Sequence, residues 1–157
     1  MKVSKHPLYH TWNSMVRRCN DPKNISYIHY GARGIKVFEE WAERGIHGTT
    51  DVPVGFLKFL EYVNKNLGSK LKEYSLDRIN NEYGYFPGNI RWADNSTQNI
   101  NRRCPNGKLR NIRLVPSGKY QVNMWYKKIN YYVGTYNSID DAIIARDNYR
   151  KMLQEIV

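Results

Sequence analysis

The sequence predicts an α+β protein built from two small units. In the first unit, apolar residues recur at helical spacing, and two short strands and a capped helix follow them. In the second unit, apolar and polar residues alternate along three segments before a helical pattern, which predicts a small three-stranded antiparallel sheet packed on one helix. A chain of 157 residues has room for two such units, each with a modest core.

Two amphipathic helices are expected in the first unit. From Pro7 to Cys19 the apolar residues recur at helical spacing, and Asn20-Asp21-Pro22 stops the pattern. A second helical pattern runs from Val54 to Asn66 and ends at Leu67-Gly68. A loop rich in Tyr, His and Gly follows the first helix and leads to a short extended segment at Ile35.

A strand, a turn, a second strand and a helix are predicted between residues 74 and 103. The strands are Tyr74–Asn80 and Gly88–Trp92. Asp94 or Asn95 begins the helix, because an Asx side chain at a helix start accepts hydrogen bonds from amide groups that the helix leaves unpaired.

The best candidate for a domain boundary follows this helix. Arg102 and Arg103 stand at the helix end, where they contact phosphate or complement the helix dipole. Pro105 and Gly107 come next, and this composition is typical of a linker. We therefore expect a first domain at 1–103, a linker at 104–108 and a second domain at 109–157.

Alternation divides the residues of the second unit between the two faces of its sheet. Tyr120, Val122 and Met124 are expected to face the helix, which Ser138 and Asp141 begin as a capping-box variant. The residues expected on the open face are Asn111, Arg113, Gln121, Asn123, Trp125 and Tyr132. These are either ordinary solvated positions or a contact surface. We favour contact, because an exposed Trp beside Arg and Asn is costly to leave bare.

The composition favours a polyanionic partner. The chain holds 25 Lys and Arg against 14 Asp and Glu, a formal net charge of +11, together with four Trp and 13 Tyr. Such a surface attracts nucleic acid, and phosphate contacts make the affinity fall steeply with salt. A ribosomal or membrane-surface protein shows the same kind of charge, so the motifs must decide.

Cysteine usage and hydropathy exclude several classes of protein. Cys19 and Cys104 are too few and too far apart for a four-cysteine site, so no structural zinc is expected. The sequence shows no secretory leader and no apolar run of membrane-spanning length. We therefore expect an intracellular, cytoplasmic protein with reduced thiols and no membrane partner.

Several separate motifs between residues 7 and 103 occur together in one known group of proteins. They are Trp12-x-x-Met15-x-x-Arg18-Cys19, Tyr30-Gly31-Ala32-Arg33-Gly34-Ile35, Trp41, Phe56, Ser75-Leu76-Asp77-Arg78-Ile79, Tyr85-x-Pro87-x-Asn89-x-Arg91-Trp92 and Gln98-x-x-Asn101-Arg102-Arg103. With these motifs the sequence resembles the HNH-like endonucleases of the ββα-metal type that phages encode. The resemblance implies a phage or mobile-element protein that acts inside an infected bacterium, with an N-terminal helical and ββα-metal unit.

The resemblance also implies a role for three polar residues. Asp77 matches the metal-binding acid, Asn89 matches the asparagine that braces the hairpin, and Gln98 matches the ligand from the helix. Oxygen ligands of this kind suit Mg²⁺ or Mn²⁺, which would hold the scissile phosphate and stabilise the leaving oxygen. For Asp77 the alternative is a structural carboxylate that pairs with Arg78 or Arg91.

The histidine base of such nucleases is missing from its usual position. Arg78 stands there and does not accept a proton near neutral pH, and neither does Asn80 two residues further on. His29, in the loop before Gly31, is then the candidate base, and His10 is a weaker one. Arg78 itself would serve as a phosphate clamp.

The second unit carries a resemblance of its own, from residue 109 to about residue 155. Its motifs are Gly118-Lys119-Tyr120, Val133-Gly134-Thr135-Tyr136 and Asp140-Asp-Ala-Ile-Ile-Ala-Arg-Asp147. Their order is similar to that of the Apetala-two DNA-binding domain of plant ethylene-response factors, which also occurs in phage nucleases. The resemblance implies that the open sheet face enters the major groove of double-stranded DNA, and Arg110 matches a further DNA-contacting position.

Different contacts are expected from different residues of this unit. A guanidinium such as Arg113 suits guanine, and an amide such as Asn123 suits adenine. Lys119, Lys127 and Lys128 are expected to contact phosphates rather than bases.

Two functions compete for this chain. The first is an HNH-like endonuclease that hydrolyses phosphodiester bonds of duplex DNA with a metal ion and is targeted by its C-terminal sheet. The alternative is a catalytically inactive DNA-binding protein on the same scaffold, which regulates or inhibits a host nuclease, and the missing histidine favours it. A third class, an RNA- or ribosome-associated protein, explains the charge but neither the strand–helix motif nor the open sheet face.

Overall fold

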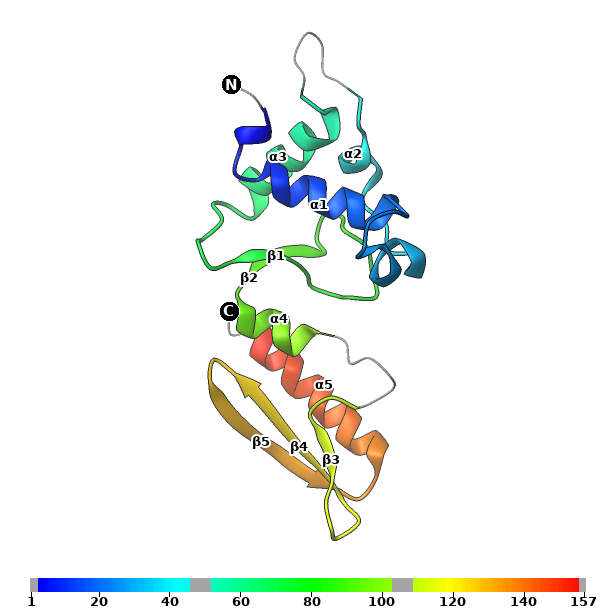
Figure 1. Cartoon of the computed structure of the whole chain (residues 1–157). Coiled ribbons are helices and arrows are strands. Elements are labelled where there is room, and N and C mark those ends of the chain that lie inside the picture. Colours follow the sequence, from blue (N-terminus) through cyan, green and yellow to red (C-terminus); the bar gives the residue numbers. More distant parts are fainter. Residues whose placement is uncertain (1–2, 46–51, 103–108, 156–157) are drawn as a thin grey trace. The chain divides into compact units, whose positions relative to one another are not determined.

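The chain folds into two compact units, Met1–Trp92 and Ala93–Val157. The computed structural model describes residues 3–45, 52–102 and 109–155 (Figure 1). Each unit has its own hydrophobic core and is described by itself. Together they have the α+β composition that the sequence predicts, with helices first and a three-stranded antiparallel sheet and helix last.

The first unit is a cluster of helices followed by a hairpin. Its α-helices are α1 (Tyr9–Asn20), α2 (Glu39–Ala42) and α3 (Val54–Asn66), and its 3-10 turns are η1 (Val3–Lys5), η2 (Tyr27–His29) and η3 (Gly31–Arg33). The two predicted amphipathic helices are confirmed. Their apolar sides meet in a core that includes Trp12, Trp41 and Phe59, and the Trp12 indole N–H donates to the Trp41 carbonyl at 2.8 Å.

Two short strands complete the first unit, β1 (Ser75–Arg78) and β2 (Ile90–Ala93). The next element, α4 (Asn95–Asn101), begins as predicted, because the Asp94 side chain accepts a hydrogen bond from the Thr97 amide at 2.8 Å. Ile100 of α4 is buried with residues of the second unit. The chain divides between Trp92 and Ala93, at the end of β2 and before α4, whereas we expected a linker at 104–108. The expected linker, 104–108, lies outside the described residues, and so does residue 103.

The second unit is a meander of three strands, β3 (Ile112–Leu114), β4 (Tyr120–Tyr126) and β5 (Ile129–Tyr136), followed by α5 (Ile139–Glu155). The strands are antiparallel in the order β3-β4-β5. The alternating segment 109–115 predicts a longer strand than β3, and β3 is shorter because Asn111 adopts a φ of 67°, outside the strand region. The alternating segment 129–133 predicts a shorter strand than β5, which extends because the pairing with β4 shifts register at Val122/Asn123 and then continues to Tyr136.

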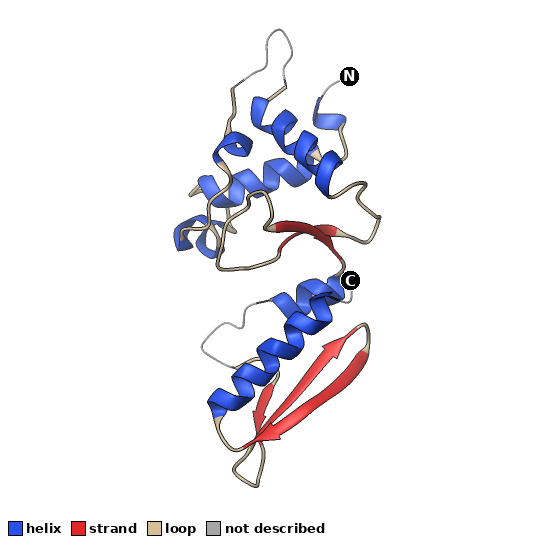
Figure 2. Cartoon of the chain, turned by 180° about the vertical axis from the view of Figure 1, so that it is seen from behind, coloured by secondary structure: helices blue, strands red, loops and turns tan. Residues whose placement is uncertain are grey.

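One face of this sheet is covered by helix. Figure 2 shows α5 running along the sheet, and its Leu153 is buried with Ile100, Met124 and Tyr126. The α5 helix starts as a capping box, because the Asp141 amide donates to the Ser138 hydroxyl at 3.1 Å. None of the helices in the described parts of the chain is long and apolar enough to span a membrane.

Candidate DNA-binding face and hairpin site

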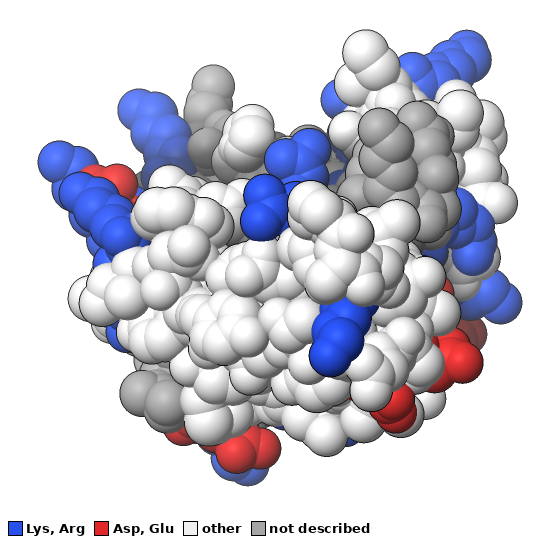
Figure 3. Space-filling view, turned by 90° about the horizontal axis from the view of Figure 1, so that it is seen from below, with Lys and Arg blue, Asp and Glu red and all other residues white. Residues whose placement is uncertain are grey.

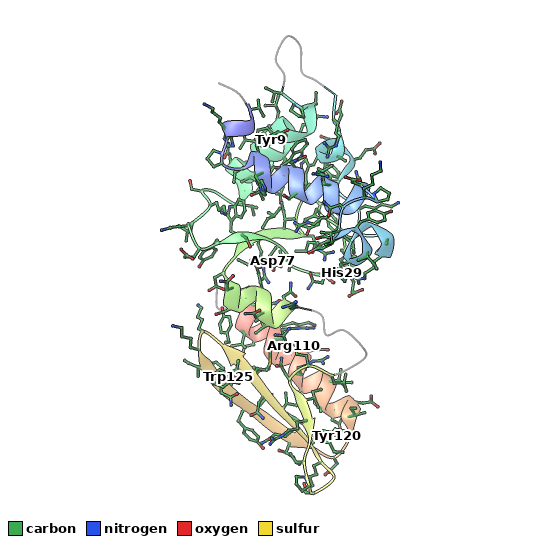
Figure 4. The ribbon with its side chains drawn as sticks, viewed as in Figure 1. Tyr9, His29, Asp77, Arg110, Tyr120 and Trp125 are labelled. Carbon is green, nitrogen blue, oxygen red and sulfur yellow. The ribbon has the colours of Figure 1, made fainter. Side chains whose placement is uncertain are left out.

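The open face of the β3-β4-β5 sheet carries large exposed side chains. Along β4, Val122 and Met124 are fully buried, whereas Trp125 is 64 % exposed. Asn123 is the register partner of Tyr132 on β5, and Tyr132 is 62 % exposed. Figure 4 shows Trp125 on the strand that also carries Tyr120. The alternation predicted for β4 is therefore confirmed, with Trp125 on the face that no helix covers.

Side-chain hydrogen bonds order this face. Arg113 and Gln121 are register partners, and Nη2 of Arg113 donates to Oε1 of Gln121 at 2.8 Å. On β5, the hydroxyl oxygens of Tyr132 and Thr135 lie 2.9 Å apart in a hydrogen bond. These bonds restrict the side chains of Arg113 and Tyr132 before any ligand is present. Binding would therefore cost less conformational entropy at these two positions.

Two residues of this face were missed by sequence reasoning. The register pairs Trp125 with Asn130 and Gln121 with Thr135, so both partners share the open face, and both are exposed. Strict alternation from Tyr132 reaches Asn130 but would place Gly134, rather than Thr135, on the open face. The register shift at Val122/Asn123 moves the phase of β5 by one residue, and no local pattern in β5 signals it.

Basic residues surround the face. Arg113, Lys119, Lys127 and Lys128 are exposed, and Lys127 and Lys128 form the turn between β4 and β5. Figure 3, which views the molecule from below the orientation of Figure 1, shows Lys and Arg side chains projecting around a broad area with few charged side chains.

The other predicted DNA contacts lie near the start of β3 and the end of α4. The Asn111 carbonyl accepts a hydrogen bond from the Asn123 amide at 3.0 Å, so Asn111 extends the pairing beyond β3. Arg110 donates to the carbonyl of Arg102, the exposed C-cap of α4, at 3.5 Å. Arg103 lies outside the described residues.

In the hairpin of the first unit, Asp77 pairs with Arg91. Both Nε and Nη2 of Arg91 donate to Oδ2 of Asp77 at 3.2 Å, across the two strands. The side chains of the pair are largely shielded from solvent, which strengthens the attraction. Of the two partners left open for Asp77, the structure therefore joins it to Arg91.

Arg78 points to the opposite side of β1, into the core. It is only 6 % exposed, and its Nη1 donates to the carbonyls of Asn81 at 3.1 Å and Tyr83 at 2.8 Å. Its guanidinium also lies over the rings of Tyr30 and Tyr85, at 5.1 and 5.2 Å from their centres. A phosphate clamp needs an accessible guanidinium, so the clamp role expected for Arg78 does not fit this geometry. The arginine instead holds the β1–β2 loop against the core.

The same aromatic pair receives a second arginine. The guanidinium of Arg18 lies 4.8 Å from the Tyr30 ring centre and 4.9 Å from that of Tyr85. Burial raises the pKa of the Tyr85 phenol well above its ordinary value, against the opposing effect of the two arginines. Burial likewise raises the pKa of the neighbouring Cys19 thiol to about 11, so this thiol stays protonated at neutral pH. The cluster is structural in character.

Asn89 occupies the bracing position that the resemblance assigns to it. It is 5 % exposed, its amide nitrogen donates to the carbonyls of Asn80 at 3.1 Å and Gly84 at 2.8 Å, and its Oδ1 accepts from the Asn80 amide at 2.9 Å. These bonds close the loop between the two strands. Its role here is to fix the path of the loop.

The predicted histidine base lies on another part of the first unit. His29 is exposed in η2, and its backbone carbonyl accepts a hydrogen bond from Arg33 at 3.3 Å. Figure 4 labels His29 on the η2 segment and Asp77 on β1. His10 is exposed on α1, with its Nδ1 3.5 Å from the Ser14 hydroxyl. His29 and His10 are thus each hydrogen-bonded within their own segments, η2–η3 and α1, and the role of a histidine base stays a prediction.

The two metal ligands expected at the hairpin and α4 have hydrogen-bond partners of their own in the structure. Oδ2 of Asp77 already has a guanidinium as its counter-ion, and the Gln98 amide nitrogen donates to the Ala93 carbonyl at 3.0 Å. Within 3–45, 52–102 and 109–155, no group of three His, Cys, Asp or Glu side chains is arranged to hold an ion. A tight Mg²⁺ or Mn²⁺ site would need more carboxylate oxygens than this.

Comparisons of the chain with protein-family models, with curated proteins and with solved structures found no match. The geometry of the two sites therefore carries the functional argument.

Proposed function

We propose that this protein binds double-stranded DNA through the open face of its β3-β4-β5 sheet. The observation that carries the proposal is the exposure of Trp125 on one face of a sheet whose other face buries Val122, Met124 and Tyr126. A soluble domain rarely leaves a large aromatic side chain bare beside amides and a guanidinium unless a partner covers it.

The chemistry of the face suits base edges in the major groove. The Arg113 guanidinium offers a fork of donors that matches guanine, and the Asn123 amide offers the donor and acceptor that match adenine. Trp125 and Tyr132 provide apolar area for the sugars and the thymine methyl group. The formal net charge of +11 supplies the long-range attraction to phosphates.

The test is fluorescence anisotropy with a labelled duplex of mixed sequence, at several salt concentrations. Trp125→Ala is expected to weaken binding about tenfold, because aromatic anchors contribute on the order of 1–3 kcal/mol. The matched control is Ile144→Ala, which removes an exposed apolar side chain from α5. Equal binding by wild type, Trp125→Ala and Ile144→Ala would refute the use of this face.

A second candidate function is metal-dependent nicking of the bound DNA. It is favoured by the order of β1, a loop braced by Asn89, β2 and a helix capped by Asp94, which is the order of a ββα nuclease motif. The burial of Arg78 and the Asp77–Arg91 pair count against it. We therefore place DNA binding first and nicking second.

A plasmid assay separates the two. Supercoiled plasmid is incubated with the purified protein in Mg²⁺ and then in Mn²⁺, alongside Asp77→Ala and the control Glu82→Ala, which removes an exposed acid from the β1–β2 loop. Nicking that is lost only in Asp77→Ala would establish a nuclease. Intact plasmid that shifts on a gel would indicate a DNA-binding protein that acts without cleavage, as a regulator or as an inhibitor of a nuclease.

A further inference from the structure

The turn between β4 and β5 has an unusual sequence for its shape. Tyr126 pairs with Ile129, which leaves a two-residue turn, and its residues Lys127 and Lys128 have φ values of 47° and 67°. Positive φ at both positions is the signature of the type I′ turn, which strongly prefers Asn followed by Gly. In this region the Cβ of any other L-residue crowds the backbone, so two lysines here destabilise the hairpin.

Both lysine side chains remain available to a ligand. They are exposed, and within the described part of the chain no salt bridge joins either to a carboxylate, although the charge of Lys127 acts at longer range on Asp94 and lowers its pKa. Nζ of Lys127 lies 5.2 Å from the centre of the Tyr126 ring. Two adjacent ammonium groups on a short, closed turn form a compact positive point.

The turn is continuous with the open sheet face. Trp125 precedes Tyr126 on β4. The register partner of Trp125 is Asn130, the second residue of β5. Ile129, the first residue of β5, is also exposed. DNA that covers Trp125 therefore brings its sugar–phosphate backbone near this end of the hairpin.

We propose that the Lys127–Lys128 turn is a phosphate-binding site at the end of the DNA-binding face, maintained at a cost in fold stability. This inference rests on the proposed function, because it takes the DNA backbone as the source of the phosphates. It also makes a prediction that would not apply to lysines in an unstrained turn. Replacing the two lysines with residues that suit the turn should raise the stability of the fold and lower the affinity for DNA.

The test is the double substitution Lys127→Asn/Lys128→Gly in the full chain, which installs the preferred turn sequence and removes both charges. Without DNA, the Tm of the second unit is expected to rise by roughly 4 °C or more. With a labelled duplex, the slope of log affinity against log salt is expected to fall by about 2, because each phosphate contact contributes about 0.9. At 0.1 M salt the affinity of the double variant is expected to be roughly tenfold or more below that of the wild type.

Two further variants separate charge from strain. Lys127→Arg/Lys128→Arg keeps both charges and both positive φ values, so its salt slope and Tm are expected to match the wild type. Lys65→Gln/Lys70→Gln removes two exposed charges from the first unit, and its salt slope is expected to stay unchanged.

The outcomes are distinct. A higher Tm with an unchanged salt slope in Lys127→Asn/Lys128→Gly would overturn the phosphate site, and a lower slope with an unchanged or lower Tm would overturn the stability cost. Equal loss of slope in Lys65→Gln/Lys70→Gln would mean that charge alone, anywhere on the chain, sets the affinity. If the wild-type protein bound no duplex, the proposed function itself would be refuted. The results for the three variants test only the phosphate site and its stability cost.

Discussion

Asn89 offers the sharpest prediction about the first unit. Replacing it with alanine removes three hydrogen bonds, two donated by its amide nitrogen and one accepted by its Oδ1. Each such bond contributes about 1 kcal/mol, and the partners left behind in a buried loop raise the cost. We therefore expect Asn89→Ala to lower the free energy of unfolding by about 3 kcal/mol, a large share of the stability of a small domain.

Urea denaturation followed by Trp fluorescence measures this loss. Trp12, Trp41 and Trp92 belong to the first unit, so a Trp125→Phe background makes the signal specific to that unit. For a slope of about 1.5 kcal/mol per molar urea, the midpoint is expected to fall by about 2 M.

A matched control distinguishes the bracing role from a general effect of losing an asparagine. Asn64→Ala changes an exposed residue of α3 and improves helix propensity, so its midpoint is expected to stay the same or rise slightly. Asn89→Asp keeps the shape but points a carboxylate at two carbonyls, so it is expected to cost at least as much as alanine at neutral pH. A midpoint for Asn89→Ala within the error of Asn64→Ala would refute the bracing argument.

Two predictions concern the second unit. Gln121→Ala frees the Arg113 guanidinium from its 2.8 Å hydrogen bond, so discrimination between a guanine-containing site and its mismatch is expected to fall about tenfold while binding to unrelated duplex changes little. Competition anisotropy with both duplexes checks this, and a uniform loss on both would contradict it. Burial opposes ionisation of Asp94, but hydrogen bonds from Thr97 and the nearby charge of Lys127 hold its pKa below the ordinary 3.8. The charged cap therefore contributes stability above pH 3.8, and this contribution is lost as the pH falls from there through the folded-state pKa. Asp94→Asn is expected to remove this acid sensitivity from α4, which thermal unfolding between pH 5 and pH 2 measures; an unchanged acid profile would show that Asp94 does not link pH to stability.

Local patterns predicted most elements because each depends on residues only a few positions apart. The apolar spacing of α1 and α3 and the alternation along β4 are visible in any short window. The cap at Asp94 and the capping box at Ser138 also involve neighbours three positions apart. A helix stripe or a strand face is set by geometry that the backbone repeats, so sequence reasoning reaches it.

The sequence by itself determined the elements, their order and the outward position of Trp125, and only the tertiary structure decided how some of them are used. Arg78 and Asp77 are adjacent in the sequence, yet one enters an aromatic core and the other pairs across the hairpin with Arg91. Likewise α4 follows β2 directly but buries Ile100 in the core of the second unit. These outcomes depend on which distant surfaces come together and exclude water, and no short stretch of sequence contains that information.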